Sequence, residues 1–594
     1  MLAGQVAAGT EPGGLLIFRD ARVFDGARVL PRASVLVRNG RVVAIGQEIK
    51  APDGASVIDA QGKTLLPGLI DSHTHVFGPE VLRAALVFGV TTEFDMFMSN
   101  AMLTNIRKVV AGEKSADIAD LRSAGTLVTA PGGYGTEYGL PIPTLSSPEQ
   151  AQAFVDARIA EGSDYIKIVY DNGKALGLNF PTLSQETLKA VIAAAHARKK
   201  LAIVHIGSLQ YAREAVEAGA DGLAHLFIDR SPDAGFGRLM ASHHAFAIPT
   251  LTVLESVSGR RGGDALARDP AIAPFLSPGG QVELNRAFPA LPRAATNYAV
   301  AEDAVRQLRA HVPILAGTDA PNPGTTHGAS LHRELELLVH AGLTPVEALA
   351  AATSVPAKQF GLEDRGTIAP GQRADLLLVD GDPTADIKAT RKIAGVWKLG
   401  VAVDRNAYVV ELEKQRAEAS TPGKVSSGAE VGLVSDFEEG KPTARFGAGW
   451  QVSTDSFRGG KSKASFKMVE DEAQKSKGAL LVEGDVDAGL PYAWAGAIFY
   501  PGQFPMSPAD LSSKKQISFW AKADGRTYSV MLFAPSKFFA PIIQTFVPGA
   551  EWKQFTFKLA QFDGYDGHDL AGLFIGAGLP AGKFALQIDD VSFQ

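Results

Sequence analysis

Two histidines separated by one residue, His73 and His75, end the predicted β-strand 65–75. Side chains two residues apart on a strand point to the same side, so both imidazoles can face one point. Imidazole is a ligand of first-row divalent metals, and zinc is the default among them. The pair alone is a weak indication of a metal site, because two histidines this close also occur by chance.

Three further polar residues, His205, His225 and Asp319, each lie in or at the end of another predicted strand. For any one of them, a hydrogen-bonded polar residue of the core is the alternative interpretation. Four histidines and one aspartate that all fall near the C-terminal ends of strands are harder to explain in that way. Together they predict a site for a divalent metal, with zinc as the default.

Lys167 lies inside the apolar segment Tyr165–Val169, where an unpaired ammonium group would be costly to bury. A salt bridge or a snorkelling side chain is the alternative interpretation. A cation would be repelled by metal ions, but a lysine carboxylated by CO2 is an anion with two oxygens. Such a group could bridge two metals.

Strand and helix patterns alternate over residues 66–360, which favours a parallel sheet buried on both faces. Eight such units predict a (β/α)8 TIM barrel, an α/β fold whose chemistry lies at the C-terminal ends of the strands. Helices are predicted at 185–198 and 209–218. The eight predicted strands are 65–75, 91–97, 125–129, 165–170, 201–207, 222–227, 247–253 and 314–319.

Short β-rich regions at residues 1–65 and 361–410 flank this α/β domain at 66–360. Neither has enough strands for a stable sheet, so we expect one composite β-sandwich domain built from both flanks. Residues 411–430 are rich in Glu, Lys, Ser and Gly without an apolar period, and they predict a linker. Aromatic residues alternate at period two in 431–594, which predicts a C-terminal antiparallel β-sandwich domain.

The composition of the 594 residues is that of a globular protein, with 46% hydrophobic and 21% charged residues. A net charge of −6 offers no basic field for nucleic acid, and no apolar run is long enough for a transmembrane segment. The absence of cysteine excludes disulfides, thiolate metal sites and a cysteine nucleophile. Residues 1–8 do not read as a signal peptide. The compartment stays open: periplasmic or secreted if a signal peptide was removed, otherwise cytoplasmic.

The segment PGLIDSHTH at 67–75, followed by Lys167, His205, His225 and Asp319, resembles the amidohydrolase superfamily of metal-dependent barrel hydrolases. The likeness covers about residues 15–410, including GTIAPGQRADL at 366–376, and is strongest to its imidazolonepropionase-like and prolidase-type dipeptidase group. The C-terminal region resembles the complex I intermediate-associated protein family, a jelly roll of galactose-binding type. DFE at 436–438 and IDDVSF at 588–593 carry that second likeness.

The resemblance implies a binuclear centre of two Zn2+ ions bridged by a hydroxide and by N6-carboxylysine at Lys167. One ion would be held by His73, His75 and Asp319, and the other by His205 and His225. Asp319 would also be the catalytic general base, and then the general acid toward the leaving nitrogen.

Candidate substrate-binding residues lie in loops that follow predicted strands. Tyr134 and Tyr138 lie in a glycine-rich loop, and Tyr170 and Asp171 end the strand of Lys167. His327 looks like the family's substrate-binding histidine, with a helix cap as the alternative. The tyrosines could equally pack on the rim. An arginine of the long connection 255–300, which contains Arg260 and Arg261, could hold a substrate carboxylate, but a solvated charge run is equally consistent.

These features predict hydrolysis of an amide or other C–N bond in a small molecule, such as a dipeptide, an N-acyl amino acid or a cyclic amide. A lactonase or esterase on the same site is one alternative, because the same nucleophile attacks those carbonyls. A carbohydrate- or protein-binding module on an inactive barrel is the alternative of another class. No nucleic-acid partner is expected, and homo-oligomerisation is left open.

Overall fold

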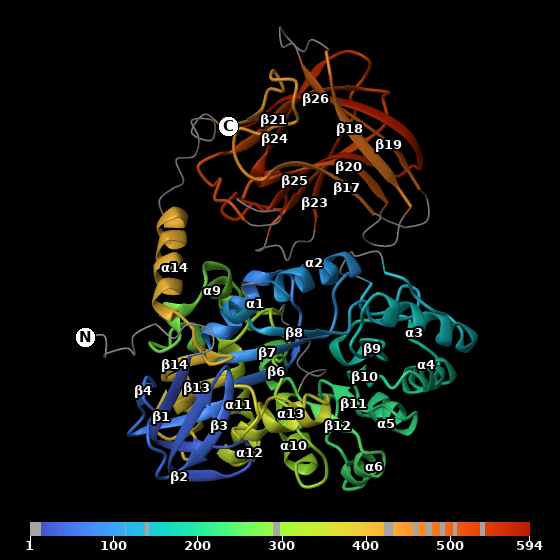
Figure 1. Ribbon diagram of the computed structural model, residues 1–594. Coiled ribbons are helices and arrows are strands. Elements are labelled where there is room, and N and C mark those ends of the chain that lie inside the picture. The colour runs from blue at the N-terminus through green and yellow to red at the C-terminus, as the bar shows by residue number, and fades with distance from the viewer. Residues whose placement is uncertain are drawn as a thin grey trace. The chain divides into compact units, whose positions relative to one another are not determined.

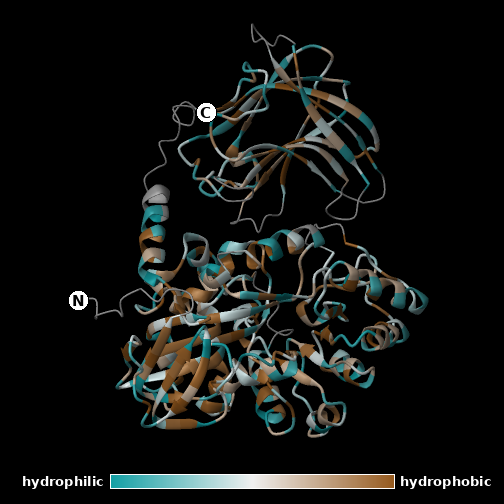
Figure 2. Cartoon of the chain, in the orientation of Figure 1, coloured by the Kyte–Doolittle hydropathy of each residue, from teal (hydrophilic) through white to brown (hydrophobic). Residues whose placement is uncertain are grey.

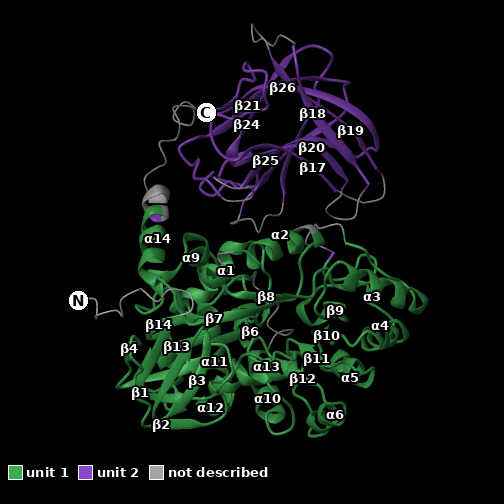
Figure 3. Cartoon of the chain, in the orientation of Figure 1, with its two compact units in different colours: residues 1–135, 142–415 green, residues 136–141, 416–594 purple. Residues whose placement is uncertain are grey.

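The computed structural model describes residues 14–112, 115–136, 142–288, 297–420, 432–455, 461–470, 478–487, 493–502, 508–534 and 541–594. The chain divides into two compact units, shown in Figure 3: Met1–Gly135 with Ile142–Gln415, and Thr136–Pro141 with Arg416–Gln594. None of the described helices combines the length and the apolar character that a membrane crossing requires.

Seven buried parallel strands form the centre of the first unit, in two sheets. The strands are short. Those of the second sheet are mostly apolar, as expected for strands that are covered on both faces, whereas those of the first sheet also carry several polar residues. In Figure 1 the helices α3, α4, α5 and α6 lie outside β9 to β12. The first sheet contains β6 (Leu69–Thr74), β7 (Val90–Asp95) and β8 (Asp120–Ser123), and the second contains β9 (Ile166–Val169), β10 (Ala202–His205), β11 (Gly222–Ala224) and β12 (Phe246–Ile248).

Isolated parallel bridges link the ends of these two sheets. Val128 pairs with Ile168 of β9, and Ala247 of β12 pairs with Ile314. Thr74 of β6 pairs with Ala320, so the segment 314–320 reaches both sheets.

Several predicted strands differ from the observed ones, and polar contacts explain two of these differences. The regular strand expected at 125–129 lies at Asp120–Ser123, ahead of Gly125, whose φ is +60°. The predicted strand 247–253 ends at Ile248 because Glu334 accepts hydrogen bonds from the amides of Leu251 and Thr252, which start helix α7 (Leu251–Val257).

The predicted strand 314–319 has no continuous ladder. The Thr318 amide donates to the Asp71 carboxylate at 3.0 Å, and Asp319 has a left-handed φ of 59°. These two departures remove the last residues of the segment from regular strand pairing. They also turn Asp319 out of the extended conformation.

The helices of the first unit pack on one large apolar core that they share with the strands. The helices predicted at 185–198 and 209–218 are confirmed as α4 and α5, each capped by the side chain of a preceding serine. The remaining helices are α1 (Pro79–Val87), α2 (Asn100–Val110), α3 (Ala151–Ala160), α6 (Phe236–Ser242), α8 (Gly262–Ala267), α9 (Pro278–Asn285), α10 (Tyr298–Leu308), α11 (Ala329–His340), α12 (Pro345–Ala351), α13 (Ser354–Gln359) and α14 (Arg405–Ser420); α4 spans Gln185–Ala197 and α5 Leu209–Glu217.

Strands from both flanks of the parallel region share one eight-stranded sheet, whose strands are largely hydrophobic in Figure 2. The sequence predicts a composite β-sandwich here. In the structure, seven strands follow one hydrogen-bonded path because β5 pairs with both β1 and β13, and β4 pairs with β1 off that path. The predicted strand 65–75 is divided at Gly68 between β5 and β6. The strands are β1 (Leu15–Phe24), β2 (Val29–Arg38), β3 (Arg41–Gly46), β4 (Ser56–Asp59), β5 (Lys63–Pro67), β13 (Leu376–Asp380), β14 (Ile393–Lys398) and β15 (Val401–Ala402).

Residues 411–420, expected as part of a linker, lie in helix α14. The helix forms because Tyr408 and Leu412, four residues apart, bury their side chains against Val87 of α1. Two apolar residues one turn apart make that contact, too few to show as a period in a charged segment. Residues 421–430 of the expected linker lie outside the described residues.

The second unit consists of antiparallel sheets, one with six and one with five strands, that share an apolar core. Of its tryptophans, Trp450 and Trp494 are buried, and Trp520 and Trp552 are half-buried. The strands are β16 (Leu433–Ser435), β17 (Gly449–Thr454), β18 (Lys463–Val469), β19 (Ala479–Val486), β20 (Trp494–Tyr500), β21 (Gln516–Ala523), β22 (Tyr528–Phe533), β23 (Ile542–Phe546), β24 (Lys553–Lys558), β25 (Gly572–Gly578) and β26 (Gly582–Phe593).

A charged cluster ties the eight-stranded sheet to the parallel strands. Asp120 of β8 accepts hydrogen bonds from the ammonium group of Lys398, which is fully buried on β14, and from Arg365 and Arg373. Burial alone would raise the pKa of Asp120, but the three cations outweigh it and lower that pKa below its ordinary value.

Replacing Asp120 by Asn should destabilise the first unit by about 3–5 kcal/mol, because three largely buried cations lose their shared carboxylate. Because folding lowers the pKa of Asp120, its contribution to the free energy of unfolding is complete above the unfolded pKa of about 4 and is lost as the pH falls below that value. The stabilities of the wild type and of Asp120→Asn should therefore converge in acid. Amide hydrogen exchange of β14 in urea measures the difference. The exposed Asp117→Asn is the control, and equal exchange in both variants at neutral pH would contradict the expectation.

Candidate metal centre

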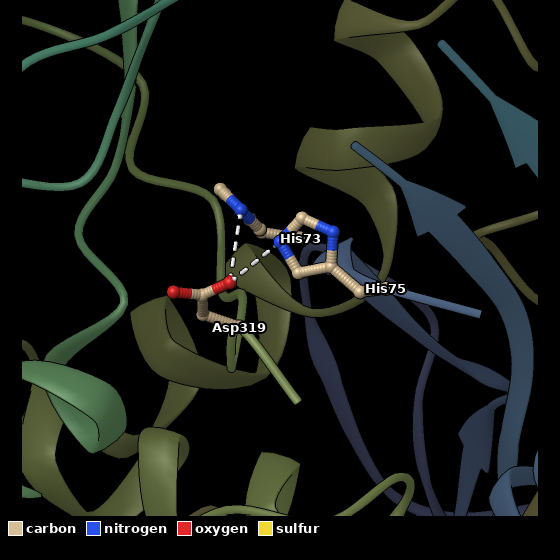
Figure 4. A group of neighbouring side chains, drawn as sticks. All are labelled: His73, His75 and Asp319. Atoms are coloured by element: carbon tan, nitrogen blue, oxygen red, sulfur yellow. Dashed lines mark ion pairs between the residues drawn. The ribbon is translucent and has the colours of Figure 1, made fainter. Parts of the chain in front are cut away.

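Three side chains converge at the C-terminal ends of the parallel strands. The Oδ1 atom of Asp319 lies 3.0 Å from His75 Nε2 and 3.3 Å from His73 Nε2, as the dashed lines of Figure 4 show. One ligand atom from each of the three residues lies within 4.8 Å of the other two. This geometry suits three ligands of a single divalent ion.

The close approach of the segment 314–320 to His73 depends on Gly317, which has no side chain. A Cβ atom on Gly317 would lie 2.6 Å from the Ile248 side chain, 2.9 Å from His73 Cβ and 3.0 Å from His73 N. The His73 carbonyl accepts hydrogen bonds from the amides of Thr318 and Asp319. The backbone of the segment thus holds His73 and Asp319 in register.

His205 and His225 continue the cluster away from His75. The ring centroid of His225 lies 4.6 Å from that of His73 and 4.7 Å from that of His205. The His225 Nδ1 atom lies 3.9 Å from Asp319 Oδ2. The structure therefore brings the four predicted histidines and the predicted aspartate into one continuous group.

Lys167 is buried on β9, and its Nζ atom has no hydrogen-bond partner. Burial lowers the pKa of Lys167 to about 7, although the charges of Asp319 and Asp95 oppose that shift. Its positive charge in turn contributes to lowering the pKa of the four histidines of the group. Lys167 therefore lies among the other five predicted ligands.

Burial sets the protonation of three of the histidines. It lowers the pKa of His73 to about 3, with a further contribution from Lys167, and it lowers the pKa of His205 and of His225. For His75, burial acts in the same direction, but Asp319 outweighs it and raises the pKa. Neutral imidazole is the form that a metal requires as a ligand.

Several polar atoms of the group are buried without a hydrogen-bond partner. They include both ring nitrogens of His73, the Oδ1 atom of Asp319 and the Nζ atom of Lys167. Buried polar atoms are normally paired, and each exception calls for an explanation such as an ion. Burial would raise the pKa of Asp319, but His73 and His225 lower it well below its usual range. Neutral imidazoles beside a carboxylate fit a zinc-type ion.

Two residues orient histidines of the group: Thr250, which sequence reasoning missed, and Asp171, which it predicted as a substrate-binding residue. The Nδ1 atom of His225 lies 2.7 Å from Thr250 Oγ1, which leaves its Nε2 atom available to a ligand. The Oδ2 atom of Asp171 lies 3.6 Å from His205 Nε2. Thr250 lies inside the predicted strand 247–253, whereas the observed strand ends at Ile248. The sequence therefore does not mark Thr250 as a residue at a strand end.

Asp95 is a further missed residue of the site. It is fully buried at the end of β7, where its carboxylate accepts hydrogen bonds from the Val76 amide at 3.0 Å and the Ser123 hydroxyl at 2.6 Å. Burial raises its pKa to about 6. Asp95 braces the segment that carries His75, and its place near the end of a predicted strand could have identified it.

The predicted substrate-binding residues fall in different places. The Tyr134 ring lies 4.9 Å from the His205 ring, and Asp171 is buried beside His205. The Tyr170 hydroxyl donates to Glu214 of α5 at 2.6 Å, away from the cluster. His327 is buried, and its Nδ1 atom contacts Glu93 of β7 at 2.9 Å. Tyr138 lies outside the described residues.

Comparison with known proteins gives two family matches. The model of the Amidohydrolase family matches residues 64–403, and the model of Complex I intermediate-associated protein 30 matches residues 436–567.

The chain is similar to imidazolonepropionases. It is 28% identical over 393 residues to that of Deinococcus deserti, covering 63% of this chain and 92% of the relative. It is 30% identical over 415 residues to that of Cereibacter sphaeroides, covering 65% and 95%. A crystal structure of a Xaa-Pro dipeptidase with bound methionine in the active site matches 66% of this chain and 99% of its own, at 24% identity and a TM-score of 0.55. The first unit thus has a TIM-barrel-like α/β fold.

Replacing Gly317 by Ala should weaken zinc binding by about 10–100-fold, because the added methyl group would displace the backbone of His73. Gly279→Ala is the matched control, since a Cβ there meets no atom within 4 Å. Competition with a chromogenic chelator measures the affinity. Wild-type affinity in a folded Gly317→Ala protein would show that the position of His73 does not depend on this contact.

Proposed function

The chain belongs to the amidohydrolase family and is a hydrolase of C–N bonds in small molecules, and from this premise we propose that it hydrolyses an amide. Dipeptides, N-acyl amino acids and cyclic amides are the substrate classes. The observation that carries the proposal is the group of His73, His75 and Asp319, whose ligand atoms converge on one point. Two of these atoms, His73 Nε2 and Asp319 Oδ1, are buried without a hydrogen-bond partner.

We propose two Zn2+ ions at this centre. His73, His75 and Asp319 would hold one ion and His205 and His225 the other, with carboxylated Lys167 shared between them. When bound, zinc would polarise the scissile carbonyl and lower the pKa of water from about 16 to near 7. The continuous row of imidazole rings from His75 to His205 supports two ions over one.

The carboxylation of Lys167 follows from its protonation. A lysine amine adds to CO2 only when it is neutral, and burial lowers its pKa to about 7, so a substantial fraction is neutral at physiological pH. The nitrogen lone pair forms an N–C bond to CO2, and one proton is released to solvent. The carbamate anion would thus replace a buried ammonium group that has no partner with a group that offers two oxygen ligands.

Asp319 is suited to move the proton. The histidines around it lower its pKa, so it is a carboxylate at neutral pH and can accept a proton at Oδ2, the oxygen that faces His225. It would then return that proton to the leaving nitrogen, whose basicity rises as the C–N bond breaks. Its left-handed backbone conformation directs the side chain to the centre.

We propose the following organisation for the whole chain. Residues 66–360 would close into a (β/α)8 barrel, with 1–65 and 361–410 as the two parts of the composite β domain. Residues 411–430 would join these to a jelly roll at 431–594. The isolated bridges at Val128, Ile314 and Ala320 support closure of the barrel.

Asp319→Asn should lower kcat on an amide substrate by at least about 1,000-fold, because it removes the proton acceptor. Zinc quantification by plasma mass spectrometry and a mass-spectrometric screen of dipeptides, N-acyl amino acids, cyclic amides and lactones identify the substrate first. Asp303→Asn, on the surface of α10, is the control. Two equivalents of zinc with turnover of lactones only would replace amide hydrolysis by ester hydrolysis.

With 13C-bicarbonate and zinc, the wild-type chain should give a carbamate carbon signal by NMR that Lys167→Arg lacks. An arginine keeps the positive charge but has no amine that can add to CO2. The exposed Lys174→Arg should retain the signal. A signal that persists in Lys167→Arg, or none in the wild type, would exclude a carboxylated Lys167.

A further inference from the structure

Aromatic rings extend the row of histidines at both of its ends. The Phe77 ring stacks beside His75, with 6.4 Å between centroids and an angle of 14° between planes. Phe77 is 52% exposed, although most large apolar side chains of its unit are buried. An exposed phenyl ring beside a metal-ligand candidate is available to a bound molecule.

At the other end of the row, Tyr134 lies beside His205, with 4.9 Å between ring centroids. Phe180 supports it at 5.2 Å. The rings follow one another in the order Phe77, His75, His73, His225, His205, Tyr134.

The loop that carries Tyr134 is held in place by close contacts. The Thr129 hydroxyl donates to the Tyr134 carbonyl at 2.9 Å. A Cβ atom on Gly133 would come within 2.6 Å of Thr129 Oγ1 and 3.0 Å of the Pro181 carbonyl oxygen. Only glycine allows these two loops to approach so closely, and that approach places Phe180 against Tyr134.

The arginines of the long connection are engaged elsewhere. The Arg260 guanidinium lies 4.3 Å from the centre of the Tyr298 ring. Arg261 donates to Asp264 at 2.7 Å, and Arg286 donates to Glu283 at 2.8 Å. Each of these interactions competes with binding of a substrate carboxylate.

We infer that the substrate carries uncharged aromatic or similarly apolar groups on both sides of the scissile bond, one packed on Phe77 and the other on Tyr134 and Phe180. The inference rests on the proposed function and names the substrate class of the same site. The inference follows because Phe77 lies beside His75 at one end of the histidine row, and Tyr134 with Phe180 lies beside His205 at the other end. A substrate that spans the row places its reacting carbonyl between them.

The test compares phenylacetohydroxamic acid with acetohydroxamic acid as ligands of the zinc-loaded full chain, by titration calorimetry. Both compounds present the same metal-binding group, so the ratio of their affinities isolates the phenyl ring. We expect the phenyl compound to bind at least about tenfold more tightly, as burial of an aromatic ring allows. Phe77→Ala or Tyr134→Ala should reduce that ratio, and the zinc content of each variant is measured alongside. Val57→Ala, an exposed apolar residue of β4, is the control.

Equal affinities for the two hydroxamates, or a ratio that neither variant reduces, would overturn the inference and leave the proposed function intact. If neither compound binds, the metal centre is absent and both proposals fall. Hydrolysis of phenylalanyl-phenylalaninamide should exceed that of aspartyl-aspartamide by at least about 100-fold in kcat/KM, and the reverse preference would overturn the inference. Tight phenylacetohydroxamate binding with no amide hydrolysis would refute the proposed function alone.

Discussion

The burial of polar atoms that have no protein partner is the constraint on which this centre depends. His73, Lys167 and Asp319 all have such atoms at the end of the parallel strands. A protein tolerates this only where another species satisfies the atoms, since each unpaired buried group costs on the order of 1–3 kcal/mol. A divalent ion, together with the carboxylation proposed for Lys167, would satisfy the whole group at once and would join the fold of the first unit to its proposed chemistry.

The backbone of the segment 314–320 places Asp319 beside the histidines. The Thr318 amide donates to both the Asp71 carboxylate and the His73 carbonyl, Asp319 takes a left-handed conformation, and Gly317 lets the segment lie against His73. These departures from regular strand structure place a carboxylate between histidines that belong to different strands. Local strain of this kind is typical of functional sites, where the surrounding fold maintains it.

The histidines themselves are oriented by groups behind them. Thr250 contacts His225, Asp171 contacts His205, and Asp95 braces the segment after His75. The aromatic rings of Phe77 and Tyr134 lie at the two ends of the row of histidines. In the proposed function, the histidines and Asp319 would carry the reaction, and the loops with these rings would select the molecules that reach it.

Sequence alone was sufficient for the alternating strands and helices and for the six members of the cluster. Periodicity is a local property, and a strand of period two places His73 and His75 on one side whatever surrounds them. Tertiary structure decided the rest. Tyr170 lies three residues after Lys167, so it faces the helices and meets Glu214. Helix α14, the pairing of β5 with both β1 and β13, and the contacts of Thr250 and Asp171 depend on residues far apart in the chain, whose proximity no local pattern records.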